Sequence, residues 1–310
     1  MKENDYDALI AGTGPAGLTA ALYGQRMGLR TVVFGDLPGG STYMIENLAN
    51  FPGLMPETSG TQFGTMTFQQ VSQEGAHFTM SLVESLQVTN GDGGRRRFMV
   101  RDAAGKEYTA PAAIIATGRT PKQLAVGNAQ MRGVHFCSIC DGPLYRGKEA
   151  VLAVVGGGNP AAQHALTLAR IAREVFLVCR SANPGMDDAH KRQLAGQPNV
   201  TLMTGTEVVG LQGKDLLEAL VVKTVDGGTK DIPVEGMFQA IGWNPNTGFL
   251  DMAVDATAEG YLKTDASLMT SCPGLFAAGD VRETDMWQVL TSCADGARAA
   301  KHVVDYLADS

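Results

Sequence analysis

The chain has 310 residues, of which 44% are hydrophobic, 18% are charged and 38 are glycine. Its length predicts two domains, each able to bury a core without disulfides or structural metal ions. The net charge of −7 disfavours sequence-independent binding to nucleic acids and to anionic membranes. This composition is typical of an α/β enzyme that binds nucleotides, and we expect no metal site.

The N-terminal segment MKENDYDALIAG argues against export and against a membrane anchor. It carries acidic residues where a signal peptide carries basic ones, and its apolar run is too short to span a bilayer. We therefore expect a cytoplasmic protein. Because cytoplasmic thiols stay reduced, its five cysteines are expected to be catalytic, metal-binding or core residues rather than structural disulfides.

The beginning of the chain predicts a buried strand, a glycine turn and a helix in succession. The strand covers Tyr6–Ala11, the turn Gly12–Gly17, and the helix runs from Leu18 to about Met27. In such a turn the first glycine permits the bend, the second lets a pyrophosphate approach the backbone, and the third allows close helix–strand packing. The helix N-terminus offers unpaired N–H groups and the positive end of its dipole to the anion.

The same pattern recurs in the middle of the chain. A strand at Ala150–Val155 leads into the turn Gly156–Ala161, a helix over about Ala162–Ala172 and another strand at Glu174–Val178. One such turn can be merely structural. Two of them, each between a strand and a helix, favour two dinucleotide sites.

Three further buried strands end in glycine, at Ala112–Gly118, Met237–Gly242 and Leu275–Asp280. The simplest layout that accommodates them inserts the second unit into the first. We expect an α/β fold with two Rossmann-like dinucleotide-binding domains, the second inserted into the first. Residues 1–117 and 246–310 would form one domain, and residues 118–245 the other.

Cys137 and Cys140 form a C-x-x-C pair beside a βαβ pattern, which indicates a redox dithiol. A zinc site would need two more ligands, but the sequence has no second C-x-x-C pair and its five histidines are scattered. A purely structural pair would not account for Asp141 directly after Cys140. Asp141, and secondly His135, are candidates to manage protons when a thiolate attacks a disulfide. Spacing leaves open which sulfur attacks the substrate.

Motifs along nearly the whole chain occur in the order seen in bacterial low-molecular-weight thioredoxin reductases, which the chain resembles. These motifs are Gly12–Gly17, Asn50–Gly53, Ala116–Gly118, Cys137–Gly142, Gly156–Ala161, Ala240–Gly242 with Pro245–Thr247, and Phe276–Asp280. A C-x-x-C-D-G motif followed by a second glycine turn is specific to this group. In glutathione-reductase-like enzymes the cysteine pair lies in the flavin domain, and an additional interface domain follows.

The resemblance implies FAD in the first domain and NADH or NADPH in the second. Electrons would pass from reduced flavin to the Cys137–Cys140 disulfide, with Asp141 as the third catalytic residue, and then to thioredoxin or a thioredoxin-like protein. The expected FAD residues are Gly12, Gly14, Pro15, Ala16, Gly17, Asp36, Gly40, Asn50, Ala116, Thr117, Gly118, Gly279, Asp280, Trp287, Gln288 and Val289. The expected nicotinamide-nucleotide residues are Gly156, Gly158, Asn159, Pro160, Ala161 and Arg180. A homodimer is also implied.

The sequence departs from the family after the strand Glu174–Val178. Typical members carry a His-Arg-Arg-x-x-x-Arg run that grips the 2′-phosphate of NADPH, whereas only Arg180 survives in the segment Cys179–Gly185. Losing two cations removes charge-assisted hydrogen bonds worth roughly 1.5–3 kcal/mol each, so NADH is an equal alternative. Trp287 stands where an arginine is usual; it is either a packed surface aromatic or a cover over the flavin or the nicotinamide entry.

Other electron donors and other functions stay open. A small redox protein such as ferredoxin is one possible donor. The chain would otherwise be a flavin-dependent dithiol oxidase that passes electrons to oxygen, or a flavin redox sensor without turnover. The retained Asp141 and the intact turn Gly156–Ala161 favour a reductase. Because the dithiol must reach both the flavin and a bulky protein disulfide, we expect the inserted domain to rotate about connections near Gly118 and Trp243–Asn246.

Overall fold

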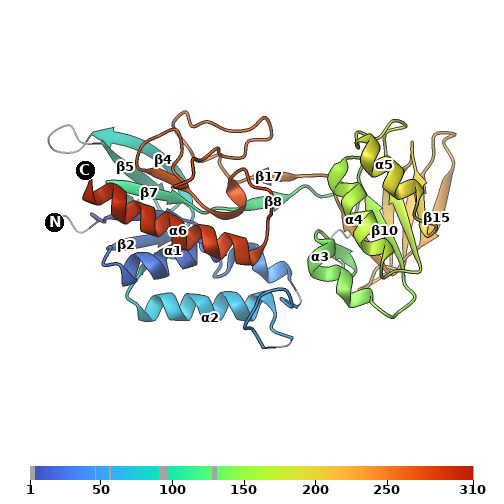
Figure 1. Cartoon of the computed structure of the whole chain (residues 1–310), viewed down its shortest axis with the longest axis horizontal. Helices are drawn as coiled ribbons and strands as arrows, with labels where there is room; N and C mark the ends of the chain where they lie inside the picture. Colours follow the sequence, from blue (N-terminus) through green and yellow to red (C-terminus); the bar gives the residue numbers. More distant parts are fainter. Residues whose placement is uncertain (1–3, 46, 56, 91–95, 128–130, 310) are drawn as a thin grey trace. The chain divides into compact units, whose positions relative to one another are not determined.

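The computed structural model describes residues 4–45, 47–55, 57–90, 96–127 and 131–309. Two compact units divide the chain, one made of Met1–Thr120 with Asn244–Ser310 and the other of Pro121–Trp243. Strands β8 (Arg119–Pro121) and β17 (Trp243–Pro245), which pair with each other, lead out of the first unit and back into it (Figure 1). The second unit is therefore an insertion in the first.

A five-stranded parallel sheet, in the order β18-β7-β1-β2-β3, forms the centre of the first unit. Its strands are β1 (Ala8–Ala11), β2 (Thr31–Phe34), β3 (His77–Thr79), β7 (Ala112–Ile115) and β18 (Leu275–Ala277). The helices are α1 (Pro15–Arg26), α2 (Gly60–Gln73) and α6 (Val289–Ala308), with the short helices η1 (Gly40–Met44) and η4 (Gly279–Val281). A three-stranded antiparallel sheet of β4 (Val83–Asn90), β5 (Arg96–Asp102) and β6 (Glu107–Ala110) completes the unit.

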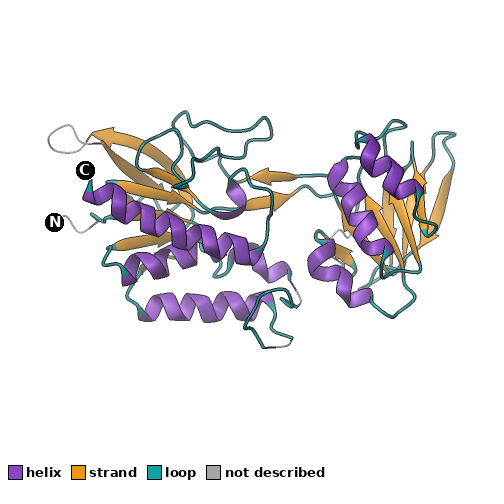
Figure 2. Cartoon of the chain, in the orientation of Figure 1, coloured by secondary structure: helices purple, strands orange, loops and turns teal. Residues whose placement is uncertain are grey.

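Strand β1 is apolar throughout because both faces of the sheet are covered. On one face Ile10 packs with Leu18 of α1 and Val303 of α6. On the other face Leu9 packs with Phe98 of the antiparallel sheet. Helices therefore cover one side of the parallel sheet and the antiparallel strands cover the other (Figure 2). Continuous apolar strands of this kind are typical of buried parallel sheets.

The second unit repeats this plan. Its parallel sheet has the order β12-β11-β10-β16-β9, with strands β9 (Val134–His135), β10 (Val151–Val155), β11 (Glu174–Val178), β12 (Val200–Met203) and β16 (Gly236–Gln239). Helices α4 (Asn159–Ala169) and α5 (Asp188–Ala195) pack on one face, and the antiparallel strands β13 (Glu207–Gln212), β14 (Ala219–Lys223) and β15 (Thr229–Pro233) pack on the other. The short helices α3 (Ser138–Asp141) and η3 (Gly142–Tyr145) precede β10.

This arrangement confirms the expected α/β fold with two Rossmann-like units. Strand β11 has the expected bounds, but α1 and α4 each begin three residues earlier than expected, at Pro15 and Asn159. Each helix has a proline in its first turn, where the fixed φ is already helical and the missing N–H costs nothing. None of the helices in the described ranges combines the length and apolar composition needed to cross a bilayer.

The contact between α1 and α6 makes a stability prediction at Gly296. Alanine is normally about 1 kcal/mol better than glycine inside a helix. At Gly296, however, a Cβ atom would overlap the backbone carbonyl of Ala16 in α1. We expect Gly296→Ala to destabilise the FAD-saturated protein by about 2 kcal/mol, measured by thermal unfolding. The exposed change Ala294→Gly should cost only about 1 kcal/mol. A stabilised Gly296→Ala variant would contradict the close helix contact.

Candidate active site

In the first glycine turn, between β1 and α1, three glycines have different surroundings. A Cβ on Gly12, whose φ is +119°, would overlap the carbonyl of Ala116, and a Cβ on Gly17 would overlap the carbonyl of Gly12. In contrast, no atom lies within 4 Å of a Cβ built on Gly14. No side chain caps the N-terminus of α1. The turn is therefore tightly packed against the sheet, but open at the helix end that attracts anions.

Other residues expected to hold FAD lie around the same end of the parallel sheet. Gly40 lies against Gly14, because a Cβ on Gly40 would be 3.0 Å from the Gly14 Cα. A Cβ on Gly279 would be 2.8 Å from the Cβ of Ala16. Ala116 directly follows β7 and donates its N–H to Ala11 at the end of β1. Ligands of parallel sheets bind at the carboxyl ends of the strands, where these residues lie.

Asp280 connects several residues in this region. Its Oδ1 accepts a hydrogen bond from Ser292 at 2.9 Å, and its Oδ2 accepts one from Arg119 Nε at 3.2 Å. Burial raises the pKa of Asp280, whereas Arg119 and Ser292 act to lower it. The guanidinium of Arg119 also lies 4.6 Å from the ring centroid of Trp287. Arg119 was not predicted from the sequence, because it belongs to no motif although it directly follows the Ala116–Gly118 motif.

Two expected flavin neighbours contact each other across 238 positions of sequence. Asn50 Nδ2 donates to Gln288 Oε1 at 2.9 Å, and Gln288 is the N-cap residue of α6. Val289 begins that helix. The preceding Trp287 packs on Tyr261 at 5.6 Å between ring centroids, and its buried Nε1 has no hydrogen-bond partner among the described residues. Asp36 is exposed on the loop after β2.

The second glycine turn, between β10 and α4, has the same local design. A Cβ on Gly156 would overlap the carbonyl of Ala240, whereas one on Gly158 would only touch Pro160 Cδ at 3.6 Å. Helix α4 begins at Asn159 without a side-chain cap, so its first N–H groups are available to an anion. Ala161 takes the place of the third glycine and is completely buried.

After β11 comes the loop where the sequence departs from the family. Cys179 is completely buried, and its thiol donates to the carbonyl of Gly156 at 3.0 Å. Burial raises the pKa of Cys179 to about 11, so this side chain is a neutral thiol that braces the glycine turn. The neighbouring Arg180 is exposed. Asp187, at the N-cap of α5, donates its backbone N–H to Asn159 Oδ1 at 2.8 Å.

Cys137 and Cys140 are joined by a disulfide, with their Cα atoms 5.3 Å apart. Cys137 is the N-cap residue of α3, and its Sγ accepts a hydrogen bond from Cys140 N–H at 3.1 Å. The backbone N–H of Ser138, the residue between Cys137 and Ile139, donates to His164 Nδ1 at 3.2 Å. This geometry confirms a disulfide-forming pair. Among the described residues no group of three or more His, Cys, Asp or Glu side chains is placed to hold a metal ion.

The two candidates for proton management lie together beside this disulfide. Asp141 is the last residue of α3, and its Oδ2 is 3.4 Å from His135 Nδ1. On its other side, His135 Nε2 lies 2.8 Å from the hydroxyl of Tyr145. Tyr145 was not foreseen from the sequence, since its spacing from Asp141 matches no known pattern.

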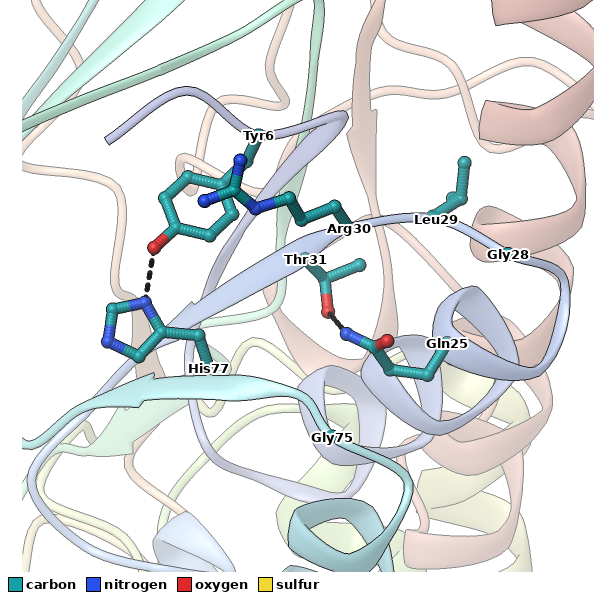
Figure 3. Close-up of a pocket in the computed structure, with 8 residues that line it drawn as sticks. All are labelled: Tyr6, Gln25, Gly28, Leu29, Arg30, Thr31, Gly75 and His77. Atoms are coloured by element: carbon teal, nitrogen blue, oxygen red, sulfur yellow. Dashed lines mark hydrogen bonds between the residues drawn. The ribbon is translucent and has the colours of Figure 1, made fainter. Parts of the chain in front are cut away.

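A pocket lies at the opposite end of the sheet in the first unit. Tyr6, Arg30 and His77 line it, each at or beside the amino end of β1, β2 or β3 (Figure 3). The Tyr6 hydroxyl forms a hydrogen bond with His77 Nδ1, and burial lowers the pKa of His77. Because the glycine turn is at the carboxyl end of these strands, this pocket is separate from the candidate site.

Comparison with known proteins agrees with this geometry over the whole chain. Residues 6–298 match the family described as pyridine nucleotide-disulphide oxidoreductase. A thioredoxin reductase of Treponema pallidum is 33% identical over 312 residues, with 98% of each chain covered. One from Listeria monocytogenes is 34% identical over 314 residues, with 99% of this chain and 95% of the relative covered.

A solved structure gives the same result for the fold. The crystal structure of thioredoxin reductase from Streptococcus pyogenes superimposes with a TM-score of 0.90 at 31% sequence identity, with 100% of both chains covered. Sequence and fold therefore agree from end to end. The chain belongs to the pyridine nucleotide-disulphide oxidoreductase family and, within it, to the group of thioredoxin reductases.

Proposed function

We propose that this protein reduces the disulfide of thioredoxin, or of a thioredoxin-like protein, with electrons from NADH or NADPH. The observation that carries the proposal is the Cys137–Cys140 disulfide, which is followed by η3, β10 and a second glycine turn in a unit inserted into a first one. Membership of the family implies FAD and a pyridine nucleotide. The name thioredoxin reductase, borne by relatives that align over the full length, supports the choice of protein substrate.

The residues of the first unit fit FAD. The open face of Gly14, at an uncapped helix N-terminus, suits a pyrophosphate, and the hydrogen-bonded carboxylate of Asp280 suits the ribityl hydroxyls. Asn50 and Gln288, already joined to each other, would lie near the isoalloxazine ring. When bound, FAD supplies a two-electron carrier between the nicotinamide nucleotide and the dithiol. We assign the remaining expected residues of this unit to the same site.

The cysteine pair performs the disulfide chemistry. Two electrons break the Cys137–Cys140 bond and, with one proton taken up, leave one thiolate and one thiol. The thiolate attacks the substrate disulfide and expels one substrate thiolate, and the second cysteine then displaces the other, so that the Cys137–Cys140 bond re-forms. Asp141, adjacent to Cys140 and almost completely buried, is placed to give and take the proton.

The relay requires the two units to move relative to each other, and the connecting strands restrict where they can bend. The carbonyl of Asn246 accepts from Thr117 Oγ1 at 2.6 Å, and Asn246 Nδ2 donates to the carbonyl of Thr117 at 2.9 Å. These two hydrogen bonds hold the connecting segments together on the side of the first unit. On the other side, Lys122 N–H donates to the carbonyl of Gly242 at 3.0 Å. We therefore place the hinge between these two sets of hydrogen bonds, in β8 and β17.

The cysteine variants test the proposal directly. In Cys137→Ser or Cys140→Ser, no disulfide can form between these positions, so thioredoxin reduction should fall by at least about a thousandfold. Bleaching of the flavin by NADH or NADPH under anaerobic conditions should continue at a similar rate, because the nucleotide turn is unaltered. Cys272→Ser, at a free cysteine outside both glycine turns, provides the matched control. Full thioredoxin turnover in either variant would refute the relay.

We infer that NADH and NADPH are accepted with little discrimination. Arg180 is the only basic residue between β11 and α5, and two carboxylates, Asp187 and Asp188, follow at the start of α5. A dianionic 2′-phosphate at the end of β11 would thus find one exposed cation. Exposure to solvent weakens that interaction through screening.

Replacing the single cation should affect one nucleotide only. We expect Arg180→Ala to lower kcat/KM for NADPH by about tenfold, which corresponds to one charge-assisted hydrogen bond of about 1.4 kcal/mol, and to leave NADH within twofold. Steady-state kinetics with both nucleotides measures this, and the exposed Arg170→Ala is the control. Equal losses with the two nucleotides, or a wild-type preference for NADPH above about a hundredfold, would overturn this assignment.

The same measurements separate the remaining functions. Bleaching by reduced ferredoxin alone would indicate a ferredoxin-dependent reductase, and rapid oxygen consumption with dithiols would indicate a dithiol oxidase. Flavin reduction without turnover of any disulfide would indicate a redox sensor.

We place the protein in the cytoplasm and expect a homodimer. Apolar side chains on α1 and α2 are exposed, with Tyr23 at 43% and Met66 at 49% exposure, which supports a dimer interface on these helices. Analytical ultracentrifugation would detect the dimer.

A further inference from the structure

We propose that His135 is a positioning residue for Asp141 and that the two side chains hold a single proton between them, with Tyr145 fixing the histidine tautomer. The proposal rests on the proposed function for its chemistry, because it concerns the proton that the cysteine pair needs. The roles of His135 and Tyr145 are assigned from the hydrogen-bond geometry. Both His135 and Asp141 are almost completely buried, with side-chain exposures of 9% and 10%.

Tyr145 determines which ring nitrogen of His135 carries hydrogen. The hydroxyl of Tyr145 donates to the backbone carbonyl of Glu235 at 3.2 Å, and a carbonyl oxygen can only accept. With its one proton directed to Glu235, this hydroxyl accepts in its 2.8 Å contact with His135 Nε2, and on that basis we assign the ring hydrogen to Nε2. In a neutral imidazole, Nδ1 is then the unprotonated nitrogen, and it is the one that faces Asp141.

An unprotonated Nδ1 facing an ionised carboxylate would leave a buried charge without a partner. Such a group is costly in a buried position, whereas one proton between the two atoms removes the cost. The proton lies either on Asp141, which then donates to Nδ1, or on Nδ1, which then donates to the carboxylate. The 3.4 Å separation of Nδ1 and Oδ2 in the structure is short enough for a small side-chain movement to close the bond.

Packing holds the imidazole in this orientation. Its ring stacks on Phe238 of β16, with centroids 4.9 Å apart and planes inclined by 25°, and meets Tyr145 edge-on at 5.6 Å. Phe238 is completely buried, so the ring of His135 cannot turn without disturbing the core of the second unit. The other ionisable groups on the elements around the pair are Glu235, whose Oε2 accepts from Val151 N–H, and His164 on α4. Burial lowers the pKa of His164, which favours its neutral form.

The shared proton matches what the disulfide requires. Breaking the Cys137–Cys140 bond with two electrons yields two sulfur anions, and delivery of one proton from the pair leaves a thiolate and a thiol. The electrons come from the reduced flavin, and the pair stays without this proton until the dithiol reacts. When the dithiol later reduces a substrate disulfide, the same pair takes the proton back from the thiol. His135 touches no sulfur in this scheme and acts through Asp141.

The experiment uses the full-length, FAD-saturated protein and two reactions of the same disulfide. The first is thioredoxin reduction, and the second is reduction of Cys137–Cys140 by dithiothreitol, followed by alkylation and mass spectrometry. In His135→Phe, which retains an aromatic ring on Phe238, we expect both rates to fall by about 10- to 100-fold and their pH profiles to change, because general-acid catalysis contributes at least that much. Tyr145→Phe, which lacks only the hydroxyl, should change the pH profile in the same direction as His135→Phe does.

His302→Phe is the matched control. His302 Nδ1 lies 3.4 Å from Asp305 Oδ2, the same separation as in the His135–Asp141 pair, but this pair lies in α6 and is partly exposed. Both rates and both pH profiles should match those of the wild type in this variant. The nitrogen-15 NMR signals of the His135 ring give an independent readout, and we expect them to show the hydrogen on Nε2.

The outcomes separate this inference from the proposed function. Unchanged rates and pH profiles in His135→Phe, or a ring protonated on Nδ1 and not on Nε2, would overturn the inference while thioredoxin reduction by the wild type remained. Absence of thioredoxin reduction in the wild type would refute the proposed function, and slower exchange with dithiothreitol in His135→Phe would still support the inference. If His135→Phe does not fold, Tyr145→Phe and the ring signals decide the matter alone.

Discussion

Both glycine turns depend on a backbone carbonyl that occupies the space of a side chain. The carbonyl of Ala116 does this at Gly12, and the carbonyl of Ala240 does it at Gly156. In each unit the first strand, the turn and a neighbouring parallel strand therefore meet at van der Waals distance, and the next glycine is left open beside a helix N-terminus. Any side chain at the first position would push the neighbouring strand away and displace the anion-binding N–H groups with it.

Half-buried and buried carboxylates around these turns each have a cation or a histidine beside them. Asp295 Oδ2 accepts from Arg282 Nε at 2.8 Å and from Gly279 N–H at 3.2 Å, and thereby holds the left-handed Gly279. Asp280, which follows Gly279, pairs with Arg119, 161 positions earlier in the chain. Such pairs add little net stability, but removing one partner leaves an uncompensated charge. Their value here is in fixing where the acceptor oxygens lie.

Residue type and spacing predicted the parts of the site that depend on the backbone. Gly12, Gly17 and Gly156 are detectable because only glycine fits their positions, and the C-x-x-C spacing already brings two sulfurs within bonding reach. Contacts made by side chains from distant segments had no such signal. Arg119 reaches Asp280 across 161 positions. The orientation of His135 depends on Phe238, and its strand β9 has two residues, too few for any periodicity.

The two segments that connect the units are bonded to each other at two places. On one side, the hydrogen bonds of Asn246 to Thr117 hold the two connecting segments together, and on the other the bond from Lys122 to Gly242 does the same. Between them lie Gly118 and the three-residue strands β8 and β17, each of which ends in a proline, Pro121 or Pro245. A proline fixes φ and donates no hydrogen bond, which narrows the freedom to a few dihedral angles. The bending that we propose for the relay is therefore confined to this short stretch of each connection, and it leaves the hydrogen bonds inside the two glycine turns and around His135 and Asp141 intact.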